Sequence, residues 1–283
     1  MRRGPELPFT RRREIAATFA RLRAEAGWGV EDVGEYLDCS PAQVSRLEDG
    51  TAALRVTEAR ELLDLYRVRG ERRESLLRLV RQASDRNWWY AHSDLLDGDF
   101  EALLILEDEA CAVRTHQPNL VPGLLQTDRY AWELMTTLGD LPLDVVERRV
   151  RLRMARQRIL SRNGGARMAV VLDEAALRRP VGRPSVMREQ YERLVTLAET
   201  ERVTIQVLPL ASGPHAAMGA AFHIFEFAGD DPWVLQLEFL DREHFADEPE
   251  EVKRYVEAFS QAAQFALDPD RSVAFLRGLA RRS

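Results

Sequence analysis

The spacing of apolar residues between positions 29 and 50 predicts two short helices joined by a tight turn. Val33 and Leu37 are four positions apart, and Val44 and Leu47 are three apart. Each helix therefore carries one narrow apolar stripe, which packs on a neighbour and leaves the opposite face polar. The pattern predicts a helix-turn-helix.

Polar residues mark the ends of the second helix. Ser40 is suited to cap it, and Pro41 fits the first helical position because its missing N–H would have no partner there. Gln43 is placed to complete a capping box with Ser40. Gly50 is a natural C-terminal stop. These signals place the second helix within residues 41–49.

The second helix has an outer face suited to DNA. When Val44 and Leu47 face the core, Ala42, Gln43 and Arg46 point outward. Glutamine matches N6 and N7 of adenine in the major groove, and arginine matches O6 and N7 of guanine. Most amphipathic helix pairs are only core, so the DNA-binding interpretation depends on the cap, the spacing and the outward residues occurring together.

This segment resembles the helix-turn-helix of the Cro/C1 repressor class, often called XRE-type, over roughly residues 13–66. The resemblance implies five short helices, with Ser40 to Gln43 and Arg46 meeting bases or flanking phosphates. It also implies that the loop from Thr51 to Arg55 approaches the DNA backbone. The first helix is expected to turn four residues inward: Ile15, Phe19, Leu22 and Ala26.

Two features depart from the usual pattern of this class. Asp38 stands where the turn usually has glycine, and aspartate adopts a left-handed conformation at a higher cost. Residues 30–50 contain six acidic residues and only Arg46 as a base. Because phosphate neutralisation supplies most non-specific affinity, one copy of the module should bind weakly. Arginines of a basic N-terminal arm, or a second subunit, would then have to compensate. The predicted DNA contacts are Ser40, Pro41, Ala42, Gln43, Arg46, Thr51, Arg55, Arg12 and Arg13.

Composition limits the possible classes of protein. The 283 residues are 45% hydrophobic and 30% charged, enough for a packed core and two domains. The net charge of −6 argues against a protein devoted to non-specific coating of nucleic acid. Cys39 and Cys111 are too few for a disulfide scaffold. With no apolar run near the ~18 residues of a membrane span and no secretory signal, a cytoplasmic location is expected.

The rest of the chain alternates between strand and helix patterns. Strands are predicted near 111–115, 167–173, 203–208, 221–227 and 233–240, and a long helix over 144–162. The fold class is an all-α helix-turn-helix domain followed by a larger α+β domain with a mixed sheet of about four to five strands. The predicted divisions are a basic arm at 1–12, a helix-turn-helix domain at 13–85, an aromatic linker at 86–99 and the α+β domain at 100–283.

The second half resembles the uncharacterised C-terminal domain of actinobacterial XRE-type regulators in the WhiJ-like or Scr1-like group. The motifs that carry the resemblance are residues 88–89, 106–110, 121–131, 153–157, 172–178, 207–209, 212–215 and Glu238, in that order. The resemblance implies an antitoxin-like transcriptional regulator whose partner is a small protein encoded nearby.

The helix predicted at 144–162 contains seven arginines, which leaves three interpretations open. It can be a solvated helix whose arginine stems cover the core and pair with acids. It can also be a docking face for an acidic partner, or a second anion contact. Arg153 and Arg156 are the residues whose neutralisation would separate these interpretations.

Candidate acid–base groups occur in the α+β domain, Glu174, His215 and Glu238 among them. No HExxH, paired CxxC, phosphate-binding glycine loop or nucleophile elbow is present, so neither catalysis, a cofactor nor a metal is expected. The loop at 213–215 remains a candidate ligand pocket. The predicted partner or ligand residues are Arg153, Arg156, Glu174, His215 and Glu238.

Two functional hypotheses remain. The first is a sequence-specific regulator that binds a double-stranded DNA operator as a homodimer, with a C-terminal domain that binds a small partner protein or ligand. The second is an adaptor in which DNA binding is weak or vestigial and the acidic domain sequesters a partner protein.

Overall fold

The structure is a computed structural model, and it describes residues 10–50, 52, 54–84, 94–96, 98–139, 141–161, 165–229, 231–239 and 243–283. Contacts within the chain separate two compact units, one spanning Leu7–Leu103 and the other containing Leu104–Ser283. We call them the first and second units. No helix in the described ranges is long and apolar enough to cross a membrane.

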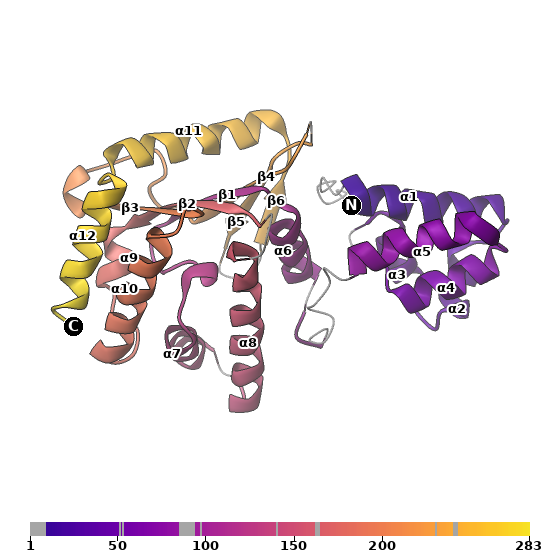
Figure 1. The fold of residues 1–283 in the computed structure, drawn as a ribbon, viewed down its shortest axis with the longest axis horizontal. Coiled ribbons are helices and arrows are strands. Elements are labelled where there is room, and N and C mark those ends of the chain that lie inside the picture. The colour runs from indigo at the N-terminus through magenta and orange to yellow at the C-terminus, as the bar shows by residue number, and fades with distance from the viewer. Residues whose placement is uncertain are drawn as a thin grey trace. The chain divides into compact units, whose positions relative to one another are not determined.

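The described part of the first unit is helical (Figure 1). Its five successive helices are α1 (Thr10–Glu25), α2 (Val30–Tyr36), α3 (Pro41–Glu48), α4 (Val56–Leu65) and α5 (Gly70–Ser84). Phe19, Leu22, Val33, Val44 and Leu63 lie together in one buried core. The apolar stripes of the sequence therefore do face a shared interior.

One predicted core position of α1 is wrong. The helix ends at Glu25, and Ala26 is exposed in the turn that follows. Gly27 then adopts a φ of 76°, which is left-handed backbone and turns the chain away from the helix axis. The helical spacing of apolar residues in the sequence therefore extends one residue past the end of α1.

The turn between α2 and α3 depends on a close approach of two backbone segments. The Cys39 N–H donates to the carbonyl oxygen of Gly34 at 2.8 Å. A Cβ on Gly34 would lie 2.9 Å from the Cys39 carbonyl oxygen, so a side chain would force the turn open. Asp38 has a φ of 52°, the left-handed conformation expected at this position.

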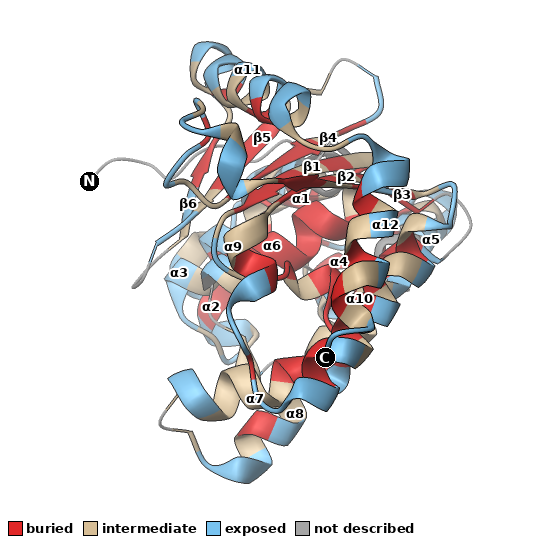
Figure 2. Cartoon of the chain, turned by 90° about the vertical axis from the view of Figure 1, so that its left-hand side faces the viewer, coloured by how far each residue is buried: buried red, intermediate tan, exposed pale blue. Residues whose placement is uncertain are grey.

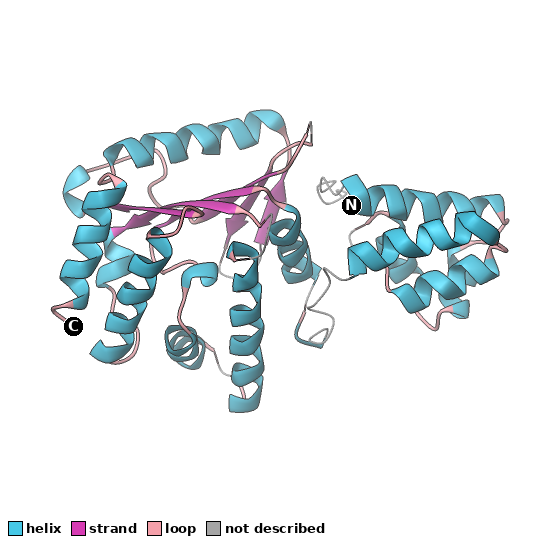
Figure 3. Cartoon of the chain, in the orientation of Figure 1, coloured by secondary structure: helices cyan, strands magenta, loops and turns pink. Residues whose placement is uncertain are grey.

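The second unit is built on a six-stranded mixed sheet with the order β3-β2-β1-β4-β5-β6 (Figure 3). The strands are β1 (Ala112–Gln117), β2 (Arg167–Asp173), β3 (Val203–Leu208), β4 (Phe222–Glu226), β5 (Val234–Glu238) and β6 (Glu243–Ala246). The pairs β1–β2 and β2–β3 are parallel. The pairs β1–β4, β4–β5 and β5–β6 are antiparallel.

Helices cover both faces of this sheet (Figures 1 and 2). One face is covered by α11 (Pro249–Phe265), which packs on Phe222, Ile224 and Leu235. The helices on the other side are α6 (Gly98–Glu109), α8 (Leu143–Arg156) and α10 (Pro184–Ala198). The remaining helices of this unit are α7 (Asp128–Leu138), α9 (Glu174–Arg178) and α12 (Pro269–Ala280), with short 3-10 turns η2 (Gly123–Leu125), η3 (Gln157–Leu160) and η4 (Leu210–Ser212).

Two predictions for the second unit need correction. The sheet has six strands rather than four to five, because the four-residue strand β6 adds an edge to β5. β6 opens with Glu243 and His244, so its sequence has too little apolar alternation to be recognised. The helix predicted over 144–162 is also shorter: α8 ends at Arg156, and η3 continues in 3-10 geometry.

Candidate DNA interface and buried polar network

The start of α3 is fixed by local hydrogen bonding. Ser40 has extended backbone, and its Oγ accepts from the Gln43 N–H at 3.2 Å. Pro41 occupies the first turn, as predicted. The Gln43 side chain does not complete the expected capping box; its Oε1 accepts from Nη2 of Arg46 instead. The two predicted base-reading side chains therefore hold one another on the helix surface.

The predicted DNA contacts of α3 lie on its outer face. Those that are exposed are Ser40, Pro41, Ala42 and Arg46. Gln43 is half-buried, and Val44 and Leu47 are 2% and 6% exposed. The outer face is therefore free of core packing, which is what insertion into a groove requires.

The other predicted contacts are placed less completely. Arg55 is exposed immediately before α4, where its Nη2 lies 2.6 Å from Oε1 of Glu58. Arg12 and Arg13 belong to α1, which begins at Thr10, so residues 10–12 of the predicted basic arm are helical. Residues 1–9 and Thr51 lie outside the described residues. DNA contact by Arg12, Arg13, Thr51 and Arg55 stays a prediction.

An ion pair attaches the end of α3 to α1. Nε of Arg23 lies 2.6 Å from Oε1 of Glu48, and Nη2 lies 2.9 Å from Oε2. Nη1 of Arg23 also donates to the Trp28 carbonyl oxygen at 2.8 Å. The hydrogen bond to Glu48 raises the pKa of Arg23. One of the six acids near the recognition helix is therefore neutralised by an arginine outside the segment.

The second unit contains a buried ion pair between α6 and α8. Nε of Arg156 lies 2.9 Å from Oε2 of Glu107, and Nη2 lies 2.5 Å from Oε1. Their side chains are only 8% and 4% exposed. Burial opposes the charge of Arg156, but the Glu107 carboxylate outweighs it and raises the arginine pKa. Two-point geometry of this kind compensates both groups for their lost hydration.

Arg153 lies one turn earlier on α8 and has a different environment. Its Nη1 donates to Oε1 of Gln126 at 2.8 Å, and it forms no ion pair in the described part of the chain. Burial, reinforced by the like charge of Arg156, lowers the pKa of Arg153 to about 10. Gln126 is fixed in turn, because its Nε2 donates to the Val121 carbonyl oxygen at 2.7 Å.

A group of polar side chains shares one face of the sheet. The pairing registers of β1, β4, β5 and β6 place together Gln117, His223, Gln236, Glu238 and Glu243. Nε2 of His223 lies 3.3 Å from Oε1 of Glu238, and Nε2 of Gln236 donates to Oε2 of Glu243 at 2.8 Å. These five residues, with Glu107, Arg153 and Arg156, are called the polar network below.

The pKa values of Glu238 on β5 and Glu243 on β6 are shifted in opposite directions. Burial and the neighbouring Glu238 raise the pKa of Glu243 to about 7. Burial also acts on Glu238, but hydrogen bonds from His223 and Gln117 and the charge of Arg156 lower its pKa. Within the described residues, no group of three or more His, Cys, Asp or Glu side chains is placed to hold a metal ion.

The structure separates the five predicted partner or ligand residues into different places. Arg153, Arg156 and Glu238 interact electrostatically in the polar network. Glu174 instead is the first residue of α9, directly after β2, where its Oε2 accepts from the Leu210 N–H at 3.0 Å. His215 follows η4, and its ring centroid is 5.4 Å from that of His116.

Sequence reasoning assigned no role to Glu107, Gln117 or Gln236. A signal for Glu107 does exist: residues 102–106 of α6 are all apolar and all buried, so the helix has no solvated face there. An acid that directly follows such a stretch has to be paired. No local signal identifies the two glutamines, because their faces are set by strand register.

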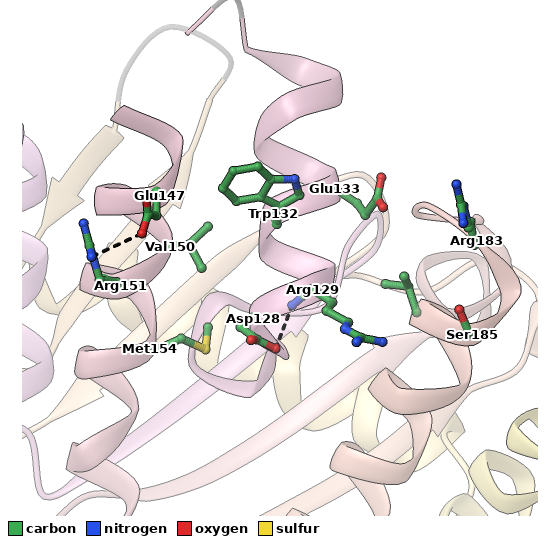
Figure 4. A pocket seen from close by; sticks show the side chains of 11 residues that line it. Asp128, Arg129, Trp132, Glu133, Glu147, Val150, Arg151, Met154, Arg183 and Ser185 are labelled. Carbon is green, nitrogen blue, oxygen red and sulfur yellow. Dashed lines mark hydrogen bonds and ion pairs between the residues drawn. The ribbon is translucent and has the colours of Figure 1, made fainter. Parts of the chain in front are cut away.

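A groove of about 760 Å³ lies between α7, α8 and the start of α10 (Figure 4). Trp132, Val150 and Met154 give it an apolar wall. Arg151 lies on its rim, paired with Glu147 at 3.2 Å. The arginines of α8 therefore divide into the buried Arg156 and half-buried Arg153, which lie in the polar network, and outer residues such as Arg151 that form ion pairs on the surface.

Comparison with known families assigns both units. Residues 14–76 match a family described as helix-turn-helix domain, and residues 100–278 match the domain of unknown function DUF5753. No curated protein and no solved structure shows significant similarity to the chain. The first match, together with the exposed face of α3, indicates a DNA-binding regulator. The second match covers more than half of the sequence, and the chain therefore belongs to the DUF5753 family.

Proposed function

We propose that this protein is a sequence-specific transcriptional regulator of the XRE type that reads a double-stranded DNA operator with α3. The observation that carries the proposal is the outer face of α3, where Ala42 and Arg46 are exposed above a capped and buried helix base. Gln43 and Arg46 are the side chains that would contact base edges. Ser40 and backbone N–H groups at the start of α3 would contact phosphate.

The regulator acts as a homodimer in this proposal. Acidic residues outnumber bases between positions 30 and 50, and the pairing of Glu48 with Arg23 removes only part of that excess. Two modules on half-sites about one helical turn apart would supply the affinity that a single module lacks. Arg12, Arg13 and Arg55 would add contacts to the DNA backbone.

The second unit is proposed to receive a signal, as the WhiJ-like and Scr1-like resemblance suggests. Its polar network is built like a recognition site, since Glu107 and Arg156 hold α6 and α8 together while Arg153 donates to the neutral amide of Gln126 and forms no ion pair within the described residues. The occupant is a small protein encoded nearby or a small ligand. We propose binding rather than catalysis, because the charged side chains are mostly engaged with one another.

The alternative is an adaptor whose helix-turn-helix binds DNA weakly and whose second unit sequesters a partner protein. The acidic residues that surround α3 favour this alternative, because exposed acids such as Glu31 and Glu35 repel phosphate. The two proposals differ in whether the purified protein selects a DNA sequence at all.

Selection of fragmented genomic DNA by the purified full-length chain tests the proposal. The regulator should enrich one motif with two-fold symmetry. Arg46→Ala should weaken binding to that motif by about 10-fold or more, given about 1–3 kcal/mol for a bidentate base contact. Gln43→Ala should relax selection at its own base pair.

The matched control is Arg78→Ala, which removes an exposed arginine from α5 and should leave selection unchanged. Absence of any enriched motif at modest salt, with and without the small protein encoded nearby, would overturn the regulator in favour of the adaptor.

A further inference from the structure

Two neighbouring histidines of the second unit each have a buried ring nitrogen without a hydrogen-bond partner. His116, the penultimate residue of β1, is fully buried, and its Nε2 has no partner among the described residues. His215 lies in the loop after η4, and its buried Nδ1 has none there either. The ring centroids are 5.4 Å apart. Because a buried polar atom without a partner is costly, two of them in adjacent rings indicate a shared occupant.

The free nitrogen of His116 carries a lone pair. Its Nδ1 lies 2.8 Å from the carbonyl oxygen of Ala220, and since a carbonyl oxygen only accepts, Nδ1 holds the proton. Burial lowers the pKa of His116, so the ring is neutral at neutral pH and Nε2 remains an acceptor. A second nitrogen that donates to a backbone carbonyl is the usual way in which proteins orient a metal-binding imidazole.

The surroundings of His116 favour positive charge. The sheet register pairs His116 with Val171 on β2, so Asp173, two residues further along β2, projects from the same face. The charge of the Asp173 carboxylate favours positive charge at His116. Both residues lie where the parallel strands β1 and β2 end, the edge at which sheets of this kind bind ligands.

The loop that carries His215 is fixed on both sides of the ring. Before it, Oγ of Ser212 donates to the Phe265 carbonyl oxygen at 3.0 Å. After it, the Ala216 N–H donates to Oε1 of Gln261 at 2.7 Å. Both partners belong to α11. The position of His215 relative to β1 is therefore set by the fold, as a preformed binding site requires.

The separation of the two rings fits a tetrahedral metal ion. With zinc–nitrogen bonds of about 2.0–2.1 Å, an ion lies about 3.2 Å from the centre of each ring that binds it. Ring centres 5.4 Å apart then subtend about 115° at the ion, close to the tetrahedral angle. A water molecule about 2.9 Å from each nitrogen would subtend only about 85°. The separation therefore suits a metal ion better than a bridging water.

We propose that Nε2 of His116 and Nδ1 of His215 bind one divalent transition-metal ion of the class that prefers imidazole, with Zn²⁺ as the probe. The described residues supply no group of three ligands, so the other two positions of the ion are open to water or to an outside ligand. The ion links the end of β1 to the loop after η4. This inference goes beyond the proposed function and does not depend on DNA binding.

Calorimetric titration of the full-length chain with zinc chloride, after removal of metal with EDTA, tests the inference. One ion should bind per chain at micromolar zinc. Magnesium chloride should not bind, because Mg²⁺ prefers oxygen ligands. Saturating zinc should also raise the temperature at which the second unit unfolds, because the two nitrogens are brought together only in the folded state.

Histidine variants then locate the ion. His215→Gln should weaken zinc binding at least about 10-fold, since loss of even an outer partner of a metal ligand costs about 10- to 100-fold. It should also abolish the effect of zinc on the unfolding temperature. His215 is only half-buried in its loop, so this variant remains informative if His116→Gln fails to fold. The matched control is His244→Gln, which removes a 49% exposed histidine of β6 and should leave zinc binding unchanged.

Either of two results would overturn the inference: no zinc binds at micromolar concentration, or His215→Gln binds zinc as tightly as the parent. The second result would assign the ion to other side chains. Operator selection is measured in the presence of EDTA. A chain that selects DNA but binds no zinc therefore overturns this inference and leaves the DNA-binding proposal intact.

Discussion

The face of α3 and the polar network of the second unit use arginine in opposite ways. Arg46 is exposed, and it donates to Gln43, which lies on the same helix three residues away. Arg156 is buried and engaged at two points by Glu107, which is 49 positions away in the sequence. The first arrangement keeps the side chain on the exposed surface of its own helix, and the second uses it to hold two helices together. The number of arginines in a helix therefore does not indicate which of them can bind another molecule.

Each region also contains a pair that departs from its general character. Among the exposed charges around α3, Arg23 and Glu48 form a two-point ion pair with side chains 18% and 13% exposed. Within the polar network, Glu243 faces the like-charged Glu238. These two pairs are where the contrast between available and engaged charges can be tested.

The largest effect is expected from breaking the buried pair of the network. Arg156→Met leaves the Glu107 carboxylate buried without a partner, and should lower the free energy of unfolding by about 3–5 kcal/mol. This loss of stability is measured from the unfolding transition of the second unit in urea. Arg151→Met is the control, because its ion pair is about 60% exposed and should contribute less than about 1 kcal/mol.

A double variant separates pairing from packing. Replacing both partners, as Glu107→Leu with Arg156→Met, should restore much of the lost stability because no charge then remains buried alone. If the free energy of unfolding of Arg156→Met lies within about 1 kcal/mol of the parent's, the Glu107 carboxylate is compensated in another way.

The next effect concerns the ion pair behind the recognition helix. Arg23→Gln removes the charged bonds to Glu48 and should cost the first unit about 2 kcal/mol. It should also weaken operator binding, because the end of α3 is no longer attached to α1. Arg21→Gln is the matched control, since Arg21 is 63% exposed and its pair with Glu25 is long at 3.8 Å. Equal DNA binding by the two variants would show that this ion pair does not position α3.

Local signals explain what the sequence predicted well. The cap at Ser40, the proline after it and the stripe of Val44 and Leu47 all act within one helix, so α3 could be located from them. The left-handed turn at Asp38 was likewise a local property. Five of the six strands were located, and each of these is at least five residues long.

What the sequence could not predict depends on distant partners. β6 is only four residues long and is defined by its pairing with β5. Arg153 and Arg156 were singled out among seven arginines, but nothing near them indicates that one meets an acid from α6 and the other does not. The faces of Gln117 and Gln236 follow from strand register, which is a property of the folded sheet.

A smaller effect is expected in the pH dependence of the network. Burial and Glu238 raise the pKa of Glu243 from 4.5 to about 7, so the folded state holds the proton more tightly than the unfolded state. The free energy of unfolding should therefore fall as pH rises from 5 to 8, by roughly 1 kcal/mol once partial exposure is allowed for.

Glu243→Gln should flatten this dependence in urea titrations at pH 5 and pH 8. Glu250→Gln, on the exposed start of α11, should leave it as in the parent. If the pH dependence of stability persists in Glu243→Gln, another group causes it, and Glu243 does not titrate in the way proposed for the network.

The smallest effect concerns the turn before α3. Asp38 has a φ of 52°, and glycine adopts that conformation without the steric cost of a Cβ. Asp38→Gly should raise the free energy of unfolding of the first unit by about 0.5 kcal/mol, since part of the relief is offset by the freer unfolded chain. It also removes one acid beside α3 and should strengthen DNA binding slightly. Asp38→Asn separates the two causes, because asparagine tolerates the left-handed turn but carries no charge. If Asn strengthens DNA binding as much as Gly does while leaving stability unchanged, charge governs affinity and backbone strain governs stability at this position.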